Sequence, residues 1–241
     1  MATPNFNKEL LKLRRRLGDI FTEDYTEITV ANVGSLDGNV WRANNLIDIY
    51  NDAVRDFLDY VVTSVPKDSW YAYLPGYIRH WAQDITPGGQ YNFSQGLVDP
   101  VDGTVVPVLF VVSLYYTKDT DHPQEFVYIS PDEYLPTKFN KFPKRRPSED
   151  SLFYTVINYG IYPIPEVAYN PCEIVFIKQH TDVVADSNTD LWGFPGEALR
   201  KVLDYAEAEA IKQKQAVGPE IVKALLQERI KSLATTIKVT T

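Results

Sequence analysis

Residues 44–66 carry one broad apolar face, and this feature constrains the possible fold more than any other. Leu46, Tyr50, Phe57 and Val61 recur at the spacing of one side of an α-helix, while aspartates fill much of the opposite side. A helix this apolar on one side needs another helix or a sheet to cover it. The sequence therefore predicts a long helix that is buried along its length.

The ends of this helix are also predicted. Asn44 or Asn45 is expected to cap its start, because a short side-chain oxygen reaches an unpaired amide of the first turn. Pro66 is expected to end it, because the residue before a proline disfavours the α conformation. A shorter helix is predicted over residues 7–17, followed by Gly18 in the left-handed geometry that ends many helices.

After residue 66 the pattern changes from helical to β-rich. An aromatic stretch and several β-branched stretches read as strands, including a hairpin; they cover residues 28–30, 70–74, 77–82, 105–116, 125–129, 153–157 with 161–164, and 172–179. Helical patterns return over residues 194–217 and 219–233. The order favours an α+β fold: a helical bundle of residues 1–66 and 191–241 with an antiparallel β module, residues 67–190, inserted into it.

Prolines add detail to the predicted secondary structure of the β module. Ser130 and Pro131 read as the cap and first residue of a helical turn. Pro136 is expected to begin a loop, and Pro163 and Pro165 place residues 161–164 towards a sheet edge, because proline donates no backbone hydrogen bond.

Composition excludes several classes of protein. The net charge of −8 argues against a free-standing nucleic-acid binder, which normally carries a basic surface. Cys172 is the single cysteine and cannot form an internal disulfide. The chain lacks a signal-peptide pattern and any run of about 20 apolar residues, so we expect a soluble protein from a reducing compartment.

Catalytic and metal-binding patterns are missing from the sequence. His80, His122 and His180 are isolated and share no metal-ligand spacing. No phosphate-binding loop, zinc-protease or nucleophile-elbow motif occurs, and Cys172 begins an apolar strand, which suits a buried thiol. We therefore expect no enzymatic activity, no cofactor and no metal, although a site assembled from distant residues stays open.

Two groups of residues are candidates for interaction. Arg14, Arg15 and Arg16 crowd the end of the first helix, where they either stay solvated and complement the helix dipole or dock an acidic partner. The second group is aromatic and suits a core, a subunit interface, or a stacking platform for a sugar or a single-stranded nucleic acid. It consists of Trp70, Tyr73, Tyr77 and Trp81.

Several segments, in order, resemble the head-to-tail adaptor (connector) proteins of tailed bacteriophages. Those proteins open with a helix ending in Arg-x-x-x-Gly-Asp, here Leu13-Arg-Arg-Arg-Leu-Gly-Asp19, and a helix with an Ile-Asn-x-Ala-x-Arg-like segment, here Ile49-Tyr-Asn-Asp-Ala-Val-Arg-Asp-Phe57. Ile129-Ser-Pro-Asp-Glu-Tyr134, the hairpin at 154–165, the strand at 173–178 and the helix within 191–210 continue the resemblance over most of the chain.

The resemblance implies a structural virion protein that forms a ring, commonly of twelve copies, beneath the portal protein. Such a ring extends the DNA channel, through which DNA passes without specific binding, and docks the next neck or tail protein. It would be assembled in the host cytoplasm, without a membrane. The resemblance also implies that the C-terminal helix and tail dock on the portal, through Ile221, Leu225, Ile230, Leu233, Ile237 and Val239.

Two alternatives remain open. One is another ring of the neck or tail, such as a stopper or tail terminator. The other is a glycan-binding module that uses Trp70, Trp81 and nearby tyrosines.

Overall fold

The computed structural model describes residues 6–85, 91–100, 103–116, 123–140, 147–148, 151–169, 172–183 and 194–215. Its fold is α+β, as predicted. The chain divides into two compact units: a helical unit, Met1–Pro75 with His180–Thr241, and a β unit, Gly76–Gln179. The expected boundaries, at residues 66/67 and 190/191, differ from these, because the first residues after 66 are helical and residues 180–183 join the helical unit.

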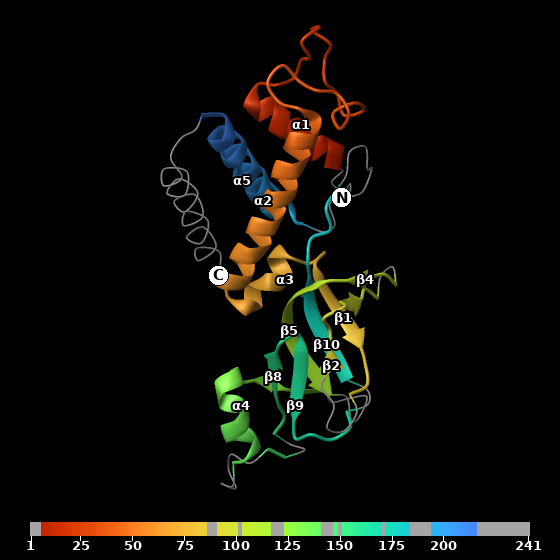
Figure 1. Cartoon of the computed structure of the whole chain (residues 1–241), viewed down its shortest axis with the longest axis vertical. Helices are drawn as coiled ribbons and strands as arrows, with labels where there is room; N and C mark the ends of the chain where they lie inside the picture. The colour runs from red at the N-terminus through yellow and green to blue at the C-terminus, as the bar shows by residue number, and fades with distance from the viewer. Residues whose placement is uncertain are drawn as a thin grey trace. The chain divides into compact units, whose positions relative to one another are not determined.

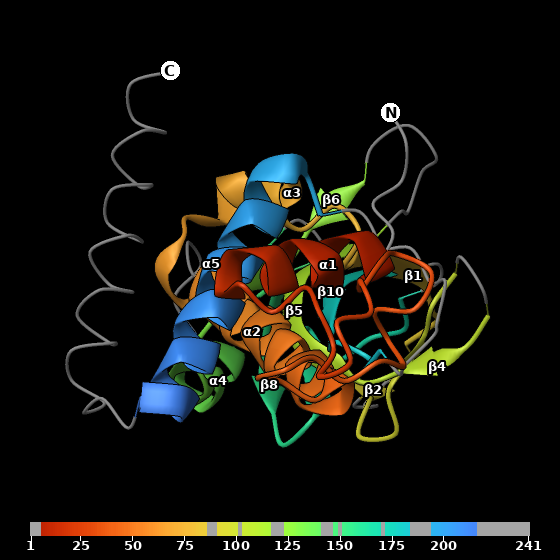
Figure 2. The ribbon, with the colours of Figure 1, turned by 90° about the horizontal axis from the view of Figure 1, so that it is seen from above.

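Three helices make up the core of the helical unit (Figures 1 and 2). Helix α2 (Ala43–Ser64) packs along α5 (Gly196–Gln215), and α1 (Phe6–Leu17) contacts both. The predicted apolar face of α2 is buried, including Leu46 and Val61. N-terminal and C-terminal segments therefore cover that face together, as the sequence pattern required.

Edge-to-face aromatic contacts also connect elements of this unit. Phe6 of α1 meets Tyr50 of α2 edge-on at 5.4 Å between ring centroids, and Phe57 of α2 meets Phe194 at 5.7 Å. Edge-to-face pairs of this kind add to the gain from burial. Ala206 and Ala210 of α5 are fully buried, and their small side chains allow the helix backbones to approach closely.

The start of α2 differs from the prediction. Arg42 occupies the capping position, and the N–H of Ala43 donates to Oδ1 of Asp37 at 2.8 Å. The proposal that Asn44 or Asn45 caps the helix is wrong, because a carboxylate from the preceding loop already serves the first turn. The predicted end is confirmed: α2 stops at Ser64, two residues before Pro66.

Residues 70–74 are helical rather than extended. A short 3₁₀ turn (Lys67–Ser69) leads into α3 (Trp70–Tyr73), and the N–H of Leu74 donates to the Trp70 carbonyl at 2.8 Å. Trp70 is buried and its indole N–H donates to the Val65 carbonyl at 2.8 Å. This anchor folds the chain back immediately after α2, so a run of aromatics that could pair as a strand makes a helical turn instead.

The β unit contains two four-stranded sheets. The first has the order β1-β10-β5-β6 and the second the order β2-β9-β8-β7. The strands of the first are β1 (Ile78–Ala82), β10 (Cys172–Lys178), β5 (Val108–Tyr116) and β6 (Gln124–Glu125). Those of the second are β2 (Tyr91–Asn92), β9 (Gly160–Ile164), β8 (Phe153–Ile157) and β7 (Val127–Tyr128). A separate hairpin pairs β3 (Leu97–Val98) with β4 (Val105–Val106).

One apolar core is shared by both sheets. Ile174 of β10 lies opposite Leu114 of β5, and Tyr154 of β8 lies opposite Pro163 of β9. Side chains from both sheets form a single buried cluster, and Cys172 is part of it. Among the described residues, every strand pair is antiparallel except β7 with β8, which run parallel.

Prolines act differently from expectation at two places in the strands. Pro107 splits the predicted strand at 105–116 into β4 and β5, because it has no N–H for a ladder. Strand β9 lies between β2 and β8 rather than at an edge. It tolerates Pro163 there because β2 pairs only with Gly160 and Ile161.

Helix α4 (Pro131–Lys138) begins as predicted but runs further. Ser130 and Glu133 form a reciprocal capping box, and Pro131 lies in the first turn. Pro136 lies inside the helix rather than beginning a loop. Helix α4 contacts β8, and its Tyr134 meets Tyr162 of β9 edge-on at 5.9 Å. It therefore packs against the second sheet (Figure 1).

Candidate interaction sites

A buried ion pair at the end of α1 organises the loop between α1 and α2. Arg14 is fully buried; its Nη1 donates to Oδ2 of Asp19 at 2.6 Å and its Nη2 to the Leu36 carbonyl at 2.8 Å. The second Asp19 oxygen accepts from the N–H of Val40 at 2.9 Å. Burial lowers the pKa of Arg14, and the Asp19 carboxylate opposes that shift. The Arg14–Asp19 pair thus connects the start of the loop, at Asp19, to its later part, at Leu36 and Val40.

The backbone geometry at the end of α1 places Asp19 next to Arg14. Gly18 has a φ of +70°, and its N–H donates to the Arg15 carbonyl at 3.2 Å, while the N–H of Asp19 donates to the Arg14 carbonyl at 2.9 Å. These two bonds form a Schellman motif, which glycine adopts at the lowest cost. The Arg-x-x-x-Gly-Asp pattern therefore encodes a buried arginine, a left-handed turn and the carboxylate that pairs with the arginine.

Gly38 lies directly against this pair. A Cβ atom at position 38 would collide with the Asp19 carboxylate and approach Nη1 of Arg14 to 2.5 Å. We expect Gly38→Ala to lower the free energy of unfolding by about 1–3 kcal/mol through overpacking. Urea denaturation followed by circular dichroism measures the change. Gly196→Ala is the matched control, because a Cβ at position 196 meets nothing within 4 Å; equal effects of the two substitutions would contradict the close packing at Gly38.

The three arginines expected to dock a partner have different environments. Arg14 is fully buried, so neither the solvated reading nor the docking reading applies to its side chain. Arg16 forms ion pairs with Asp204 at 2.6 Å and Glu207 at 3.0 Å, which tie the end of α1 to α5. Arg15 is exposed and remains the one of the three whose position suits either reading.

Asn51 of α2 holds the chain where it returns from the β unit. Its side-chain amide donates to the Val183 carbonyl at 3.0 Å, and its Oδ1 accepts from the Val183 N–H at 3.0 Å. Asn51 and Val183 are both buried. The same Oδ1 lies 2.9 Å from Nε2 of His180, which must therefore carry the hydrogen. Arg55, one turn further along α2, pairs with Asp182. The Asn-x-Ala-x-Arg segment is thus the attachment point of residues 180–183.

His180 makes this attachment sensitive to pH. Burial lowers its pKa from the usual 6.5 to about 4; Asp182 opposes the shift and Arg55 adds to it. Between about pH 6.5 and pH 4 the unfolded chain binds the proton and the folded chain does not, so stability falls as the pH falls. We expect a loss of up to about 2–3 kcal/mol across this window.

Urea denaturation at pH 7 and pH 4.5 checks this expectation. His180→Gln keeps a hydrogen-bond donor but cannot titrate, so its stability should fall less between the two pH values than that of the unmodified chain. His80→Gln is the matched control, because His80 is exposed and pairs with Glu173 in the β unit. An identical pH dependence in His180→Gln and in the unmodified chain would show that His180 does not carry the effect.

The four aromatic candidates are divided between the two units. Trp70 and Tyr73 belong to the helical unit, whereas Tyr77 and Trp81 belong to the β unit. Trp70 and Tyr77 are 3% and 1% exposed, so neither ring is available to a partner, and burial raises the pKa of Tyr77. Trp81 is half-buried and packs on Tyr91 at 5.2 Å. This arrangement gives the glycan-binding alternative little support.

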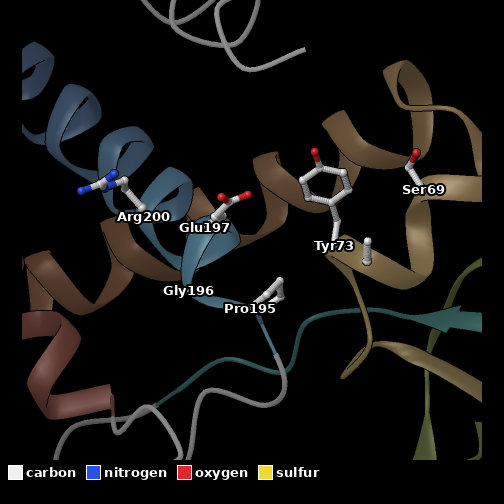
Figure 3. A pocket seen from close by; sticks show the side chains of 7 residues that line it. Ser69, Tyr73, Pro195, Gly196, Glu197 and Arg200 are labelled. Atoms are coloured by element: carbon white, nitrogen blue, oxygen red, sulfur yellow. The ribbon is translucent and has the colours of Figure 1, made fainter. Parts of the chain in front are cut away.

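Tyr73 borders a hollow of about 680 Å³ in the helical unit. Ser69 and Tyr73 approach it from the turn before α3 and from α3, and Pro195, Glu197 and Arg200 from the start of α5 (Figure 3). Burial raises the pKa of Tyr73, and the neighbouring Glu197 carboxylate adds to the shift. An aromatic ring and a carboxylate therefore border the hollow, and the guanidinium of Arg200 extends away from Tyr73 (Figure 3).

A second buried charge cluster lies in the β unit. Asp99 is fully buried and accepts two bonds from Nε of Arg79, both at 2.9 Å, and one from Nζ of Lys178 at 2.9 Å. Arg79 is on β1, Lys178 on β10, and Asp99 follows β3, so the cluster ties the β3–β4 hairpin to the first sheet. The sequence carried no signal for this cluster, because its members are about 20 and 79 positions apart.

Cys172 is buried in the β core, and burial raises the pKa of its thiol to about 12. Within the described residues, no group of three or more His, Cys, Asp or Glu side chains is placed to hold a metal ion. Nor does any helix in the described part of the chain have the length and apolar character needed to cross a membrane. The tail candidates Ile221, Leu225, Ile230, Leu233, Ile237 and Val239 lie outside the described residues.

Comparison with known proteins assigns no family. No protein-family description matches the chain, and a search of curated proteins finds no match either.

Proposed function

We propose that this chain is a structural virion protein, a head-to-tail adaptor that forms a ring beneath the portal. In that role it extends the DNA channel and docks the next neck or tail component. The observation that carries the proposal is the role of the two motifs behind the resemblance. The Arg14–Asp19 pair and the Asn51 attachment are both buried determinants of the helical unit. Buried residues with specific geometric roles constrain a fold more than solvated residues do, so these two motifs support the resemblance.

Exposed apolar side chains support a role in protein contacts. On the β unit, Val127 and Tyr128 of β7 are 57% and 50% exposed, and Leu135 and Phe139, in and just after α4, are 59% and 67% exposed. Each of these four side chains is therefore accessible to a protein partner. The net charge of −8 suits a channel wall, because cationic walls would retain DNA phosphates through counterion release.

Native mass spectrometry of the chain, alone and mixed with the portal protein of the same genome, tests the proposal. We expect several copies of the chain to add to the portal ring. A chain that stays monomeric and never binds the portal would contradict it. Binding to a tail protein but not to the portal would instead favour a stopper or tail terminator.

A further inference from the structure

The cluster of Arg79, Lys178 and Asp99 in the β unit has more positive than negative charge. Nε of Arg79 and Nζ of Lys178 each lie 2.9 Å from Oδ2 of Asp99, which is fully buried, so two cations share one carboxylate. Other arginines of the described residues have at least one carboxylate for each cation; they are Arg14 with Asp19, Arg16 with Asp204 and Glu207, and Arg55 with Asp52 and Asp182. The excess positive charge is found in a chain whose net charge is −8.

The two cations of this cluster keep hydrogen-bond donors that the protein does not use. A guanidinium has five N–H groups and an ammonium has three. Arg79 donates from Nε to Asp99 and from Nη1 to the Ile78 carbonyl, and Lys178 donates to Asp99. Within the described part of the chain, neither side chain makes a further hydrogen bond. Nη2 of Arg79 and the remaining N–H groups of Lys178 therefore have no protein acceptor.

The unused donors reach solvent although the cluster is mostly buried. The side chains of Arg79 and Lys178 are only 13% and 16% exposed. Nη2 of Arg79 is nevertheless not one of the buried side-chain atoms that lack a partner, unlike Nε of Arg14. An excess charge in a mostly desolvated site is costly unless a counter-charge joins it. An incoming oxyanion would accept from the unused N–H groups and also neutralise that charge.

The backbone holds the cluster in place before any ligand arrives. Asp99 follows β3 in the β3–β4 hairpin, where its N–H donates to the Thr104 carbonyl at 2.7 Å and its carbonyl accepts from the N–H of Gly103 at 2.8 Å. Arg79 and Lys178 are on β1 and β10, which pair as neighbouring strands. Because the two cations are already positioned, binding costs little conformational entropy.

We propose that Arg79 and Lys178 form a binding site for a carboxylate side chain of a protein partner. The single excess charge matches one carboxylate, and a guanidinium beside an ammonium can donate to both of its oxygens. The small exposed area suits a group carried on a flexible stem. The net charge of −8 disfavours the approach of nucleic acid, which is a polyanion. The site goes beyond the proposed adaptor function and does not depend on it.

Nuclear magnetic resonance of the full chain, titrated with a blocked Gly-Glu-Gly peptide, tests the proposal. The backbone amide signals of Arg79, Asp99 and Lys178 should shift and then saturate as the peptide is added. A blocked Gly-Gln-Gly peptide is the matched ligand control, because it has nearly the same shape without the charge. It should leave these three signals unchanged.

Substitutions at position 178 provide a second readout. Lys178→Met removes the excess charge but leaves Asp99 bonded to Arg79, so the chain should fold and bind the glutamate peptide at least about tenfold more weakly. Lys178→Arg keeps the charge and should retain binding. Lys138→Met is the matched control, because Lys138 forms an ion pair with a single carboxylate, Glu166, in the same unit; it should bind the peptide as the unmodified chain does.

Three results would overturn the proposal. The first is equal shifts with the two peptides, a comparison that uses the unmodified chain and so holds even if a variant does not fold. The second is equal binding of the glutamate peptide by Lys178→Met and the unmodified chain. The third is a shift of the same signals with a short DNA duplex but not with the glutamate peptide, which would assign the site to phosphate. None of these results depends on ring formation, so the proposed adaptor function is tested separately.

Discussion

Replacing Asp19 with alanine should lower the free energy of unfolding by about 3–5 kcal/mol, because it removes the carboxylate that forms an ion pair with the buried Arg14 guanidinium. The N–H of Val40 also loses its acceptor. Arg14 lies in the last turn of α1, and Val40 lies on the loop that connects α1 to α2, so the end of the helix and the loop should loosen together. Urea denaturation, followed by circular dichroism at neutral pH, measures the loss.

Two controls separate the ion pair from general damage at this site. Asp24→Ala removes an exposed carboxylate from the same loop and should change stability by less than about 0.5 kcal/mol. The double variant Arg14→Met with Asp19→Leu removes both charges and should recover much of the loss. A double variant as unstable as Asp19→Ala would show that loop geometry, rather than an unpaired charge, dominates the effect.

Replacing Asn51 with leucine should cost about 2–5 kcal/mol, because the N–H and carbonyl of Val183 would each be buried without a partner. Leucine has nearly the same shape as asparagine, so lost hydrogen bonds rather than lost volume account for the change. The donor at Nε2 of His180 loses its acceptor as well. Denaturation measures the stability, and hydrogen exchange at residues 180–183 reports whether that segment detaches.

Asn44→Leu is the matched control, because Asn44 is exposed on the same helix. It should leave both the stability and the exchange at residues 180–183 nearly unchanged. Faster exchange at Val183 in Asn51→Leu, with the rest of α2 protected, would locate the damage at the attachment point. Unchanged exchange at Val183 would contradict the role assigned to Asn51.

Local patterns predicted much of the fold. The apolar face of α2 is spread along the helix, so its spacing alone indicates burial, and Leu46 and Val61 are buried as expected. The Ser130 cap and the β8–β9 hairpin also depend on residues close together in the chain. Features set by neighbours in sequence were therefore visible without a structure.

Features that depend on contacts between residues far apart in the chain could not be predicted from the sequence. Asn51 and Val183 are 132 positions apart, so nothing near Asn51 marks it as an attachment point. Arg14 was expected either to stay solvated or to dock an acidic partner, because arginine is seldom fully buried. Its burial depends on the turn at Gly18, which returns Asp19 to it. The spacing of arginine, glycine and aspartate in the Arg-x-x-x-Gly-Asp motif was the one local signal for this pair.

The structure buries some of the candidate interaction residues and leaves others accessible. Trp70 and Tyr77 were proposed as interface residues for their aromatic character, yet both rings are buried. Tyr73, from the same group, borders the hollow at α5. Composition indicated that aromatic contacts matter, but the choice among rings needed the structure.

The proposed function makes this chain part of a phage particle, so electron microscopy of purified particles, labelled with an antibody against the chain, tests it most directly. We predict that the label lies at the neck, between the portal and the tail, and that particles lacking the chain keep filled or emptied heads without attached tails. Label on another part of the particle, or purified particles that do not contain the chain, would contradict the proposal.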